Sequence, residues 1–336
     1  MSQVNHHYSA DQPLADRRRV NGVASQSFPL VEAPVRRSSN VHQAFLVAIA
    51  LGAGPASAAA QQPAATATWT AVEDAIGRKG AMQPGNVIKF AFPRSDLSVT
   101  VAGITLKPAL ALGGWVAFKE LSGGQAMAMG DLVLTEDEVA PVMKALQAGG
   151  VEETALHNHL QHESPRIMFM HISAHGDPAT IARAIHAALA TSKTPLDAPP
   201  PSMTSAADLD TTGIAKALGT AGKLNGVVYQ VSVPRGETIT HMGAEVPPSM
   251  GVATAINFQP TGGGKAAITG DFVLLGPEVN PVARALRDHD IDVTAVHSHM
   301  LVEEPRLFFM HFWANADAVT LAKGLRAALD QTKSRK

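Results

Sequence analysis

The feature that most constrains the fold is an internal repeat with an offset of 140 residues. The segment GDLVLTEDEVAPVMKAL at 130–146 recurs as GDFVLLGPEVNPVARAL at 270–286, with 10 of 17 positions identical. The segment ALHNHLQHESPRIMFMH at 155–171 recurs as AVHSHMLVEEPRLFFMH at 295–311, with 9 of 17 positions identical. This period is far longer than that of a solenoid, so the sequence predicts two homologous copies of one domain.

The two copies are predicted at residues 69–192 and 209–332, with a Pro-rich linker at 193–208 between them. The chain has 336 residues, of which 46% are hydrophobic and 17% charged, so it can bury two cores of ordinary size. Each copy begins with helical spacing that ends on glycine, at 70–80 and 212–222.

Short β-rich stretches follow in copy one at 87–93, 115–121 and 126–134. A helix is predicted over 135–149, because its apolar residues recur on one face and its first turn is acidic. Two further strands and a last helix over 178–190 close the unit. This order predicts an α+β fold, in which two tandem modules have mostly antiparallel sheets, flanking helices and pseudo-twofold symmetry.

Residues 36–58 have the layout of a secretory signal peptide. Two arginines precede an apolar centre at 44–53, and the small residues Ala56, Ser57 and Ala58 precede the expected cleavage point. The apolar run is too short to span a membrane, so we expect export to the periplasm or beyond without stable membrane insertion. The alternative interpretation is an Ala-rich linker.

Two polar segments flank this predicted signal. Residues 59–68 are expected to form a disordered lead to the mature protein. Residues 1–35 are polar and aperiodic, which predicts a disordered extension or a start codon that truly lies at Val35 or Val41.

Composition removes several classes of function. The net charge is −2 and there is no long basic run, which argues against a nucleic-acid partner. Cysteine is absent, which excludes disulfides, thiolate catalysis and Cys-type zinc sites. Any metal must therefore be held by histidine, carboxylate, carbonyl or water.

The repeated histidines are the strongest functional signal. If 156–160 is a strand, His157 and His159 share one of its faces. If that strand and the next form a hairpin centred on residue 164, His157 lies opposite His171, with Glu163 in the turn. The predicted metal ligands of the two copies are His157, His159, Glu163, His171, His297, His299, Glu303 and His311. These ligands suit a divalent transition metal, namely zinc, iron, manganese, copper or nickel.

Two arginines lie next to the predicted metal sites. Arg166 and Arg306 each follow a proline, and a guanidinium there suits either the carboxylate or phosphate of a small-molecule ligand or the neighbouring Glu163 or Glu303. Another repeated pattern, Arg94 with Asp96 and Arg235 with Glu237, predicts a structural ion pair in each copy.

The differences between the copies favour the first as the more active. His162 is replaced by Val302 and His175 by Asn315 in copy two, so copy one is richer in titratable groups. The candidate catalytic residues are therefore His175 and His162, as proton carriers, and Arg166.

Four segments, PRSDL, PALALGGWVAF, MGDLVLTEDEVAPVM and TALHNHLQHESPRIMFMH, resemble the LppY/LpqO-like family of exported bacterial proteins of unknown function. The resemblance covers about residues 69–332. It implies export and the duplicated domain, and it implies no substrate or reaction. Members of this family include lipoproteins, whereas this chain has no cysteine to carry a lipid.

The leading hypothesis from the sequence is an exported metal-binding protein. It would be a metalloenzyme whose centre consists of three histidines and one glutamate on a β-hairpin, with an arginine for an anionic group. One alternative is a non-catalytic binding module for a small anion or a metal. The other is a structural domain pair whose histidines belong to the core.

Overall fold

The computed structural model describes residues 67–197 and 208–335, and both copies belong to one compact unit. The predicted N-terminal extension and signal peptide, nearly all of the lead and most of the linker lie outside the described residues. No helix among those residues has the length and apolarity that crossing a bilayer requires.

The two copies contain the same main helices and strands in the same order and differ only in short elements. Copy one consists of α1 (Ala67–Ile76), β1 (Ala81–Gln83), β2 (Val87–Pro93), β3 (Thr100–Val101), β4 (Ile104–Thr105), α2 (Pro108–Ala111), β5 (Gly113–Glu120), η1 (Ser122–Gly124), β6 (Ala126–Thr135), α3 (Glu136–Ala148), β7 (Glu152–His157), β8 (Ile167–Gly176) and α4 (Pro178–Leu189). Copy two consists of α5 (Thr211–Leu218), β9 (Lys223–Asn225), β10 (Val228–Pro234), β11 (Thr240–His241), β12 (Ala244–Glu245), η2 (Pro248–Met250), β13 (Ala253–Gly262), β14 (Lys265–Leu274), α6 (Gly276–Arg287), β15 (Asp292–His297), β16 (Glu303–Glu304), β17 (Phe308–Asp317) and α7 (Ala318–Leu329).

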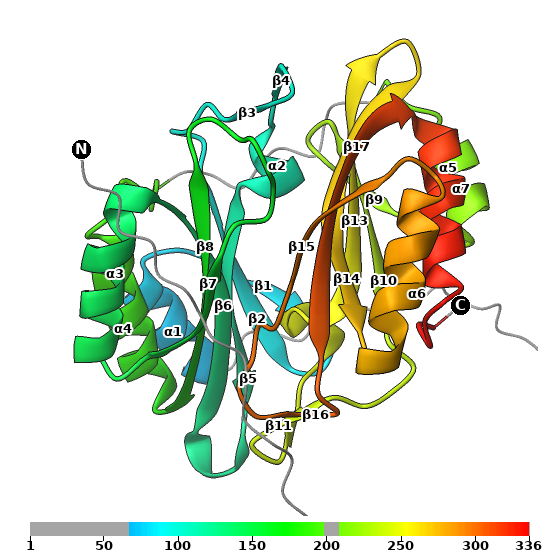
Figure 1. Cartoon of the computed structure of the whole chain (residues 1–336). Coiled ribbons are helices and arrows are strands. Elements are labelled where there is room, and N and C mark those ends of the chain that lie inside the picture. Colours follow the sequence, from blue (N-terminus) through cyan, green and yellow to red (C-terminus); the bar gives the residue numbers. More distant parts are fainter. Residues whose placement is uncertain (1–66, 198–207, 336) are drawn as a thin grey trace, which may run out of the picture. The chain divides into compact units, whose positions relative to one another are not determined.

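Each copy forms a six-stranded antiparallel sheet. The strand order is β1-β2-β5-β6-β8-β7 in copy one, and the equivalent strands of copy two have the same order. Helices α1, α3 and α4 cover one face of the first sheet, and α5, α6 and α7 cover one face of the second (Figure 1). The predicted α+β class with two antiparallel modules is confirmed.

Side chains along the central strands alternate between two hydrophobic cores, one against the helices and one against the other copy. On β6, Leu132 and Leu134 face the helices, whereas Met127 and Val133 face the opposite way, into clusters that contain residues of both copies. Such alternation is expected of a strand that is buried on both faces. The sheet face without helices therefore packs against the other copy.

Two apolar clusters between the copies reveal the pseudo-twofold symmetry. Met127 and Phe309 belong to one cluster, and Ala267 and Phe169 belong to the other. Residues 127 and 267, like 169 and 309, are equivalent positions in the repeat. Each cluster thus combines one part of copy one with the complementary part of copy two, as a twofold arrangement requires.

A buried ion pair fixes the first turn of α3 to the sheet. Arg94, which is fully buried, donates to both carboxylate oxygens of Glu138 at 2.7 and 3.1 Å and to Asp96 at 2.9 and 2.8 Å. Glu138 also accepts from the backbone N–H groups of Thr135 and Lys193, both at 2.8 Å. The predicted structural role of the Arg94–Asp96 pair is thereby confirmed.

Copy two repeats this arrangement. Arg235 donates to Glu278 at 2.7 and 3.0 Å and to Glu237 at 3.0 Å, and Glu278 accepts from the backbone N–H of Lys333 at 2.9 Å. In each copy the carboxylate therefore joins the helix start, the sheet and the segment after the last helix. The second predicted pair is structural as well.

Candidate metal centre

The six repeated histidines of the two copies lie in a single cluster. His157 ends β7, His171 lies within β8, and His159 lies in the segment between these strands. His297, His299 and His311 occupy the equivalent positions around β15 and β17. The sequence predicted a separate centre in each copy, whereas the structure combines both sets.

The predicted hairpin register is wrong. The structure pairs Ala155 with His171 and His157 with Phe169, and β7 ends at His157 instead of continuing to residue 160. The segment 158–166 is a long connection and β7 contains an irregularity before Ala155, so the register does not follow from a symmetric turn. The shift of two residues preserves the sheet face, and the rings of His157 and His171 still lie 5.1 Å apart, centroid to centroid.

The shortest ring distances between histidines join one copy to the other. The centroids of His157 and His297 lie 3.7 Å apart. The other two close pairs, at 3.8 and 3.6 Å, are His159 with His311 and His171 with His299. Each pair contains one histidine from each copy, so the cluster is made by the packing of the two sheets.

Two groups of these side chains have the proximity that metal ligation needs. Nitrogen atoms of His157, His159 and His171 lie within 4.8 Å of one another. The second group meets the same limit and contains His157, His297, His299 and His311. In the second group, the Nε2 atoms of His297 and His299 are only 2.7 Å apart, so one ring donates a hydrogen bond to the other.

Two aspartates that the sequence analysis had not selected join the cluster. Asp131 pairs with His171 across strands and Asp271 pairs with His311, so each carboxylate points to the same face as its histidine. Asp131 Oδ1 lies 3.7 Å from His171 Nε2, and Asp271 Oδ2 lies 3.7 Å from His299 Nε2.

One backbone contact fixes which nitrogen of His311 can ligate. His311 Nδ1 lies 2.8 Å from the carbonyl oxygen of Gly270, and a carbonyl oxygen can only accept, so Nδ1 carries the proton. The Nε2 atom therefore presents a lone pair to the cluster. A metal-ligating histidine is commonly oriented in this way.

Unpaired polar atoms are concentrated at this cluster. Buried side-chain nitrogen and oxygen atoms nearly always have a hydrogen-bond partner, because burying them without one costs free energy. Among the described residues, these cluster atoms are shielded from solvent and lack such a partner: Asp131 Oδ1, both ring nitrogens of His157, His159 Nε2, His171 Nε2, Asp271 Oδ1, His297 Nδ1 and His311 Nε2. Each neutral imidazole keeps one nitrogen lone pair, so these rings and the two carboxylates together offer a set of acceptors that suits a cation.

The surroundings keep the imidazoles neutral. Burial, followed by the adjacent His297, lowers the pKa of His157 to about 3, and burial lowers that of His297 to about 4. Burial also lowers the pKa of the other four histidines well below its ordinary value. For Asp131, burial raises the carboxyl pKa to about 7. Neutral imidazoles are the form that ligates a metal ion.

These shifts predict that the chelator-treated protein loses stability as the pH falls from 7 to 5. Unfolded histidines, with a pKa near 6.5, take up protons in this window, whereas the six folded ones stay neutral, so acid favours the unfolded chain. Asp131, Asp271 and Glu163 act in the opposite sense, because burial raises their pKa values and lets the folded state bind protons, but they are three groups against six. Urea midpoints at several pH values measure the slope.

The matched variant for this prediction is His159→Asn with His299→Asn, which removes two of the six titrating groups. We expect a shallower dependence of the urea midpoint on pH in the double variant than in the wild type. An unchanged slope would show that these imidazoles titrate alike in the folded and unfolded states.

The two predicted glutamate ligands lie outside both histidine groups. Glu163 accepts from the backbone N–H of Ile167 at 3.0 Å, and Glu303 accepts from that of Leu307 at 2.9 Å. In each copy the carboxylate thus closes the segment that leads into the next strand. The structure brings Asp131, and not Glu163, toward the imidazoles.

The predicted catalytic and anion-binding residues are likewise distributed outside the cluster. Arg166 is 63% exposed and lies 3.9 Å from Glu136. Arg306 donates to the carbonyl oxygen of Met300 at 3.0 Å and pairs with Glu303 at 3.2 Å. His162, Arg166 and Glu163 line a groove of about 560 Å³, which also reaches His157 and His297.

His175 lies farther along β8, away from the cluster. Its side chain is exposed, and its ring centroid is 5.5 Å from that of His241. His241 is buried and lies 3.4 Å from the Ser173 hydroxyl. His175 therefore neighbours a different pair of polar side chains.

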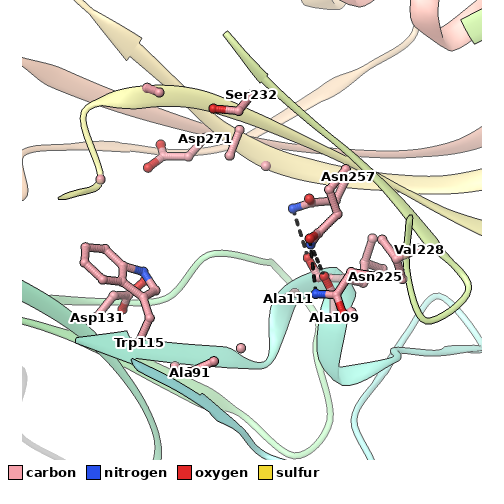
Figure 2. A pocket seen from close by; sticks show the side chains of 18 of the residues that line it. Ala91, Ala109, Ala111, Trp115, Asp131, Asn225, Val228, Ser232, Asn257 and Asp271 are labelled. Carbon is pink, nitrogen blue, oxygen red and sulfur yellow. Dashed lines mark hydrogen bonds between the residues drawn. The ribbon is translucent and has the colours of Figure 1, made fainter. Parts of the chain in front are cut away.

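A cavity of about 1080 Å³ also adjoins the histidine cluster, and its lining differs from that of the groove. His159, His171, His299 and His311 contribute to this lining, together with Asp131 and Asp271. Figure 2 shows Trp115 and Asp131 on strands of copy one, and Ser232 and Asp271 on strands of copy two. This volume is sufficient for a small organic molecule in contact with the cluster.

One family model matches the chain, and it matches each copy separately. The profile of a family described as "Domain of Unknown Function (DUF1259)" matches residues 70–191 and again residues 212–331. No curated protein matches the chain.

Three solved structures resemble the chain weakly. They are a trimeric bacterial microcompartment shell protein, PduB (13% identity, TM-score 0.19, covering 75% of this chain and 89% of that one), EtuB from Clostridium kluyveri (12%, 0.18, 74% and 90%), and the double-ringed trimeric shell protein MSM0271 from the RMM microcompartment (12%, 0.18, 61% and 82%). TM-scores this low support no inference about the fold or the function.

Proposed function

Because the chain belongs to the DUF1259 family of domains of unknown function, with one match in each copy, we propose a function from its own residues: it is an exported metalloenzyme whose metal centre lies between the two copies. The ligands come from the six clustered histidines and from Asp131 and Asp271. The metal is a divalent transition ion, for which imidazole and carboxylate are suitable donors.

The observation that carries this proposal is the set of unpaired nitrogen and oxygen atoms around the cluster. A purely structural role for the histidines would pair these atoms within the fold, as His186 does through its bond to the Ile76 carbonyl at 2.9 Å. A bound cation satisfies several lone pairs at once. The cluster therefore fits a metal better than a polar core.

The cavity favours catalysis over simple metal storage. Asp131 and Asp271 line it alongside four of the histidines, so a metal held there would face a space that accepts a small molecule. The chemistry that such an ion supplies is polarisation of a substrate oxygen or activation of a water molecule. The residues of the cluster hold the ion, and the cavity holds the substrate.

Export is the second part of the proposal. It rests on the signal-like layout of residues 36–58 and on the resemblance to the LppY/LpqO-like exported proteins. Comparing the N-terminal residue of the protein purified from its host with the expected cleavage after Ala58 would test this part separately.

The test of the metal centre is elemental analysis of protein that was purified from its native host without any chelator. We expect at least one equivalent of a transition metal per chain by inductively coupled plasma mass spectrometry. The variant His289→Ala changes an exposed histidine that follows the C-cap of α6 and should retain the same metal content. A wild-type protein without stoichiometric metal would refute the proposal.

A further inference from the structure

The cavity beside the metal centre is asymmetric, although the cluster is nearly symmetric. Lys89 occupies the third position of β2, where the equivalent residue of β10 is Gln230. Trp115 on β5 corresponds to Ala255 on β13. Copy one therefore contributes a cation and a large aromatic ring where copy two contributes a neutral amide and a methyl group.

The surroundings of Lys89 are a carbonyl oxygen, an aromatic ring and, at longer range, the Asp131 carboxylate, which favours the charged form of the lysine. Its ammonium donates to the carbonyl oxygen of Ser249 at 3.0 Å and lies 3.9 Å from the centroid of the Trp115 ring. Among the described residues no carboxylate forms a salt bridge with it. Burial lowers the pKa of Lys89 to about 8, which leaves it largely protonated at neutral pH. An ammonium has three donors, so at least one remains available for a ligand.

The charges that line the cavity are unequally distributed. Its acidic side chains are Asp131 and Asp271, which belong to the proposed ligand set. Its lysines are Lys89, together with the exposed Lys107 and Lys223 where the cavity meets solvent. Once the two aspartates bind a cation, the rest of the lining is positively charged. Such a lining attracts anions.

The sheet register places Lys89 and Asp131 on the same face of one sheet. Trp115 lies opposite Ala91 of β2 and opposite Asp131 of β6, and Lys89 is two residues along β2 from Ala91, on the same face. Strands β2 and β6 are separated by two strand spacings, or roughly 10 Å. A small molecule can therefore reach both Lys89 and the centre.

We propose that the substrate of the metal centre is a small organic anion, whose carboxylate or phosphate group pairs with Lys89 while its body lies against Trp115. This assignment rests on the proposed function, since the other end of the substrate faces the metal. It replaces Arg166, which lies on the groove instead of in the cavity, as the anion-binding residue.

The test uses metal-loaded, full-length protein and isothermal titration calorimetry with phenyl phosphate, benzoate and the neutral analogue benzamide. We expect at least one of the two anions to bind more tightly than benzamide, and the tighter anion identifies the preferred group. In Lys89→Gln, which introduces the residue of copy two, we expect about tenfold or more weaker binding of that anion, whereas Lys89→Arg should retain most of it. The control Lys79→Gln alters a lysine that is 81% exposed and should bind as the wild type does.

Metal analysis of the same variants separates this inference from the proposed function. Unchanged metal content in Lys89→Gln, together with weaker anion binding, supports the assignment. Equal anion binding by Lys89→Gln and the wild type, a preference for benzamide, or loss of metal from Lys89→Gln would overturn it. A wild type that lacks metal and still binds anions through Lys89 would contradict only the metalloenzyme proposal.

Discussion

Simultaneous replacement of His157 and His297 by alanine is expected to remove at least about nine-tenths of the metal from a protein that stays folded. The two rings lie 3.7 Å apart, and His157 belongs to both groups of candidate ligands. Both side chains are half-buried and both carry unpaired ring nitrogens, so the main atom that loses a partner on their removal is His299 Nε2. Elemental analysis gives the metal content, and circular dichroism reports the fold.

Single variants refine this prediction. His157→Ala should lower the metal content more than His297→Ala, because only His157 belongs to both groups. The control His289→Ala should match the wild type in metal content and in its circular dichroism spectrum. If the double variant were folded and retained stoichiometric metal, the centre would have to lie elsewhere in the protein.

The second large effect concerns stability. Arg94→Met is expected to lower the free energy of unfolding by about 3–5 kcal/mol, because it leaves the carboxylate of Glu138 buried without its cation. Arg94 is fully buried and Glu138 is 7% exposed, so water cannot replace the lost contacts. Urea denaturation followed by fluorescence measures the change, and Arg235→Met in copy two should have a similar effect.

The comparison with an exposed ion pair isolates the role of burial. Lys79 pairs with Glu73 at 2.8 Å but is 81% exposed, so Lys79→Met should leave the urea midpoint nearly unchanged. The double variant Arg94→Met with Glu138→Met should recover part of the stability, since no buried charge remains. The recovery is only partial because Glu138 also accepts two backbone N–H groups. Equal midpoints for Arg94→Met and Lys79→Met would disprove the proposed anchoring.

Much of the fold could be predicted from the sequence because the repeat presents each main element as two related sequences, which can be compared. The acidic start and apolar face at 135–149 predict a helix, and α3 extends over Glu136–Ala148 with Thr135 at its N-cap. The β-rich stretch at 126–134 corresponds to β6. Identical histidine spacing in both copies identified six side chains that the structure brings together. These inferences use only local patterns.

The remaining features depend on contacts between distant segments. Asp131 and Asp271 were retained in both copies, yet so were residues such as Gly130 and Pro141, and no local pattern distinguishes a ligand from a structural residue. Their strand register against His171 and His311 is what places them in the cluster. The pairing of histidine rings between the two copies could not be predicted from the sequence either, because the packing of the two sheets determines it.

A tandem chain can also do what a pair of identical subunits cannot. In a symmetric homodimer every substitution appears twice. A lysine at the position of Lys89 in one subunit would therefore be accompanied by the same lysine of the other subunit in the shared cavity. The covalent duplication frees the two halves to diverge, and here Lys89 and Trp115 stand on one side alone. A bound molecule would therefore have a single orientation in the cavity, with one of its ends at Lys89 and Trp115. The histidines at its other end nevertheless keep their pseudo-twofold arrangement.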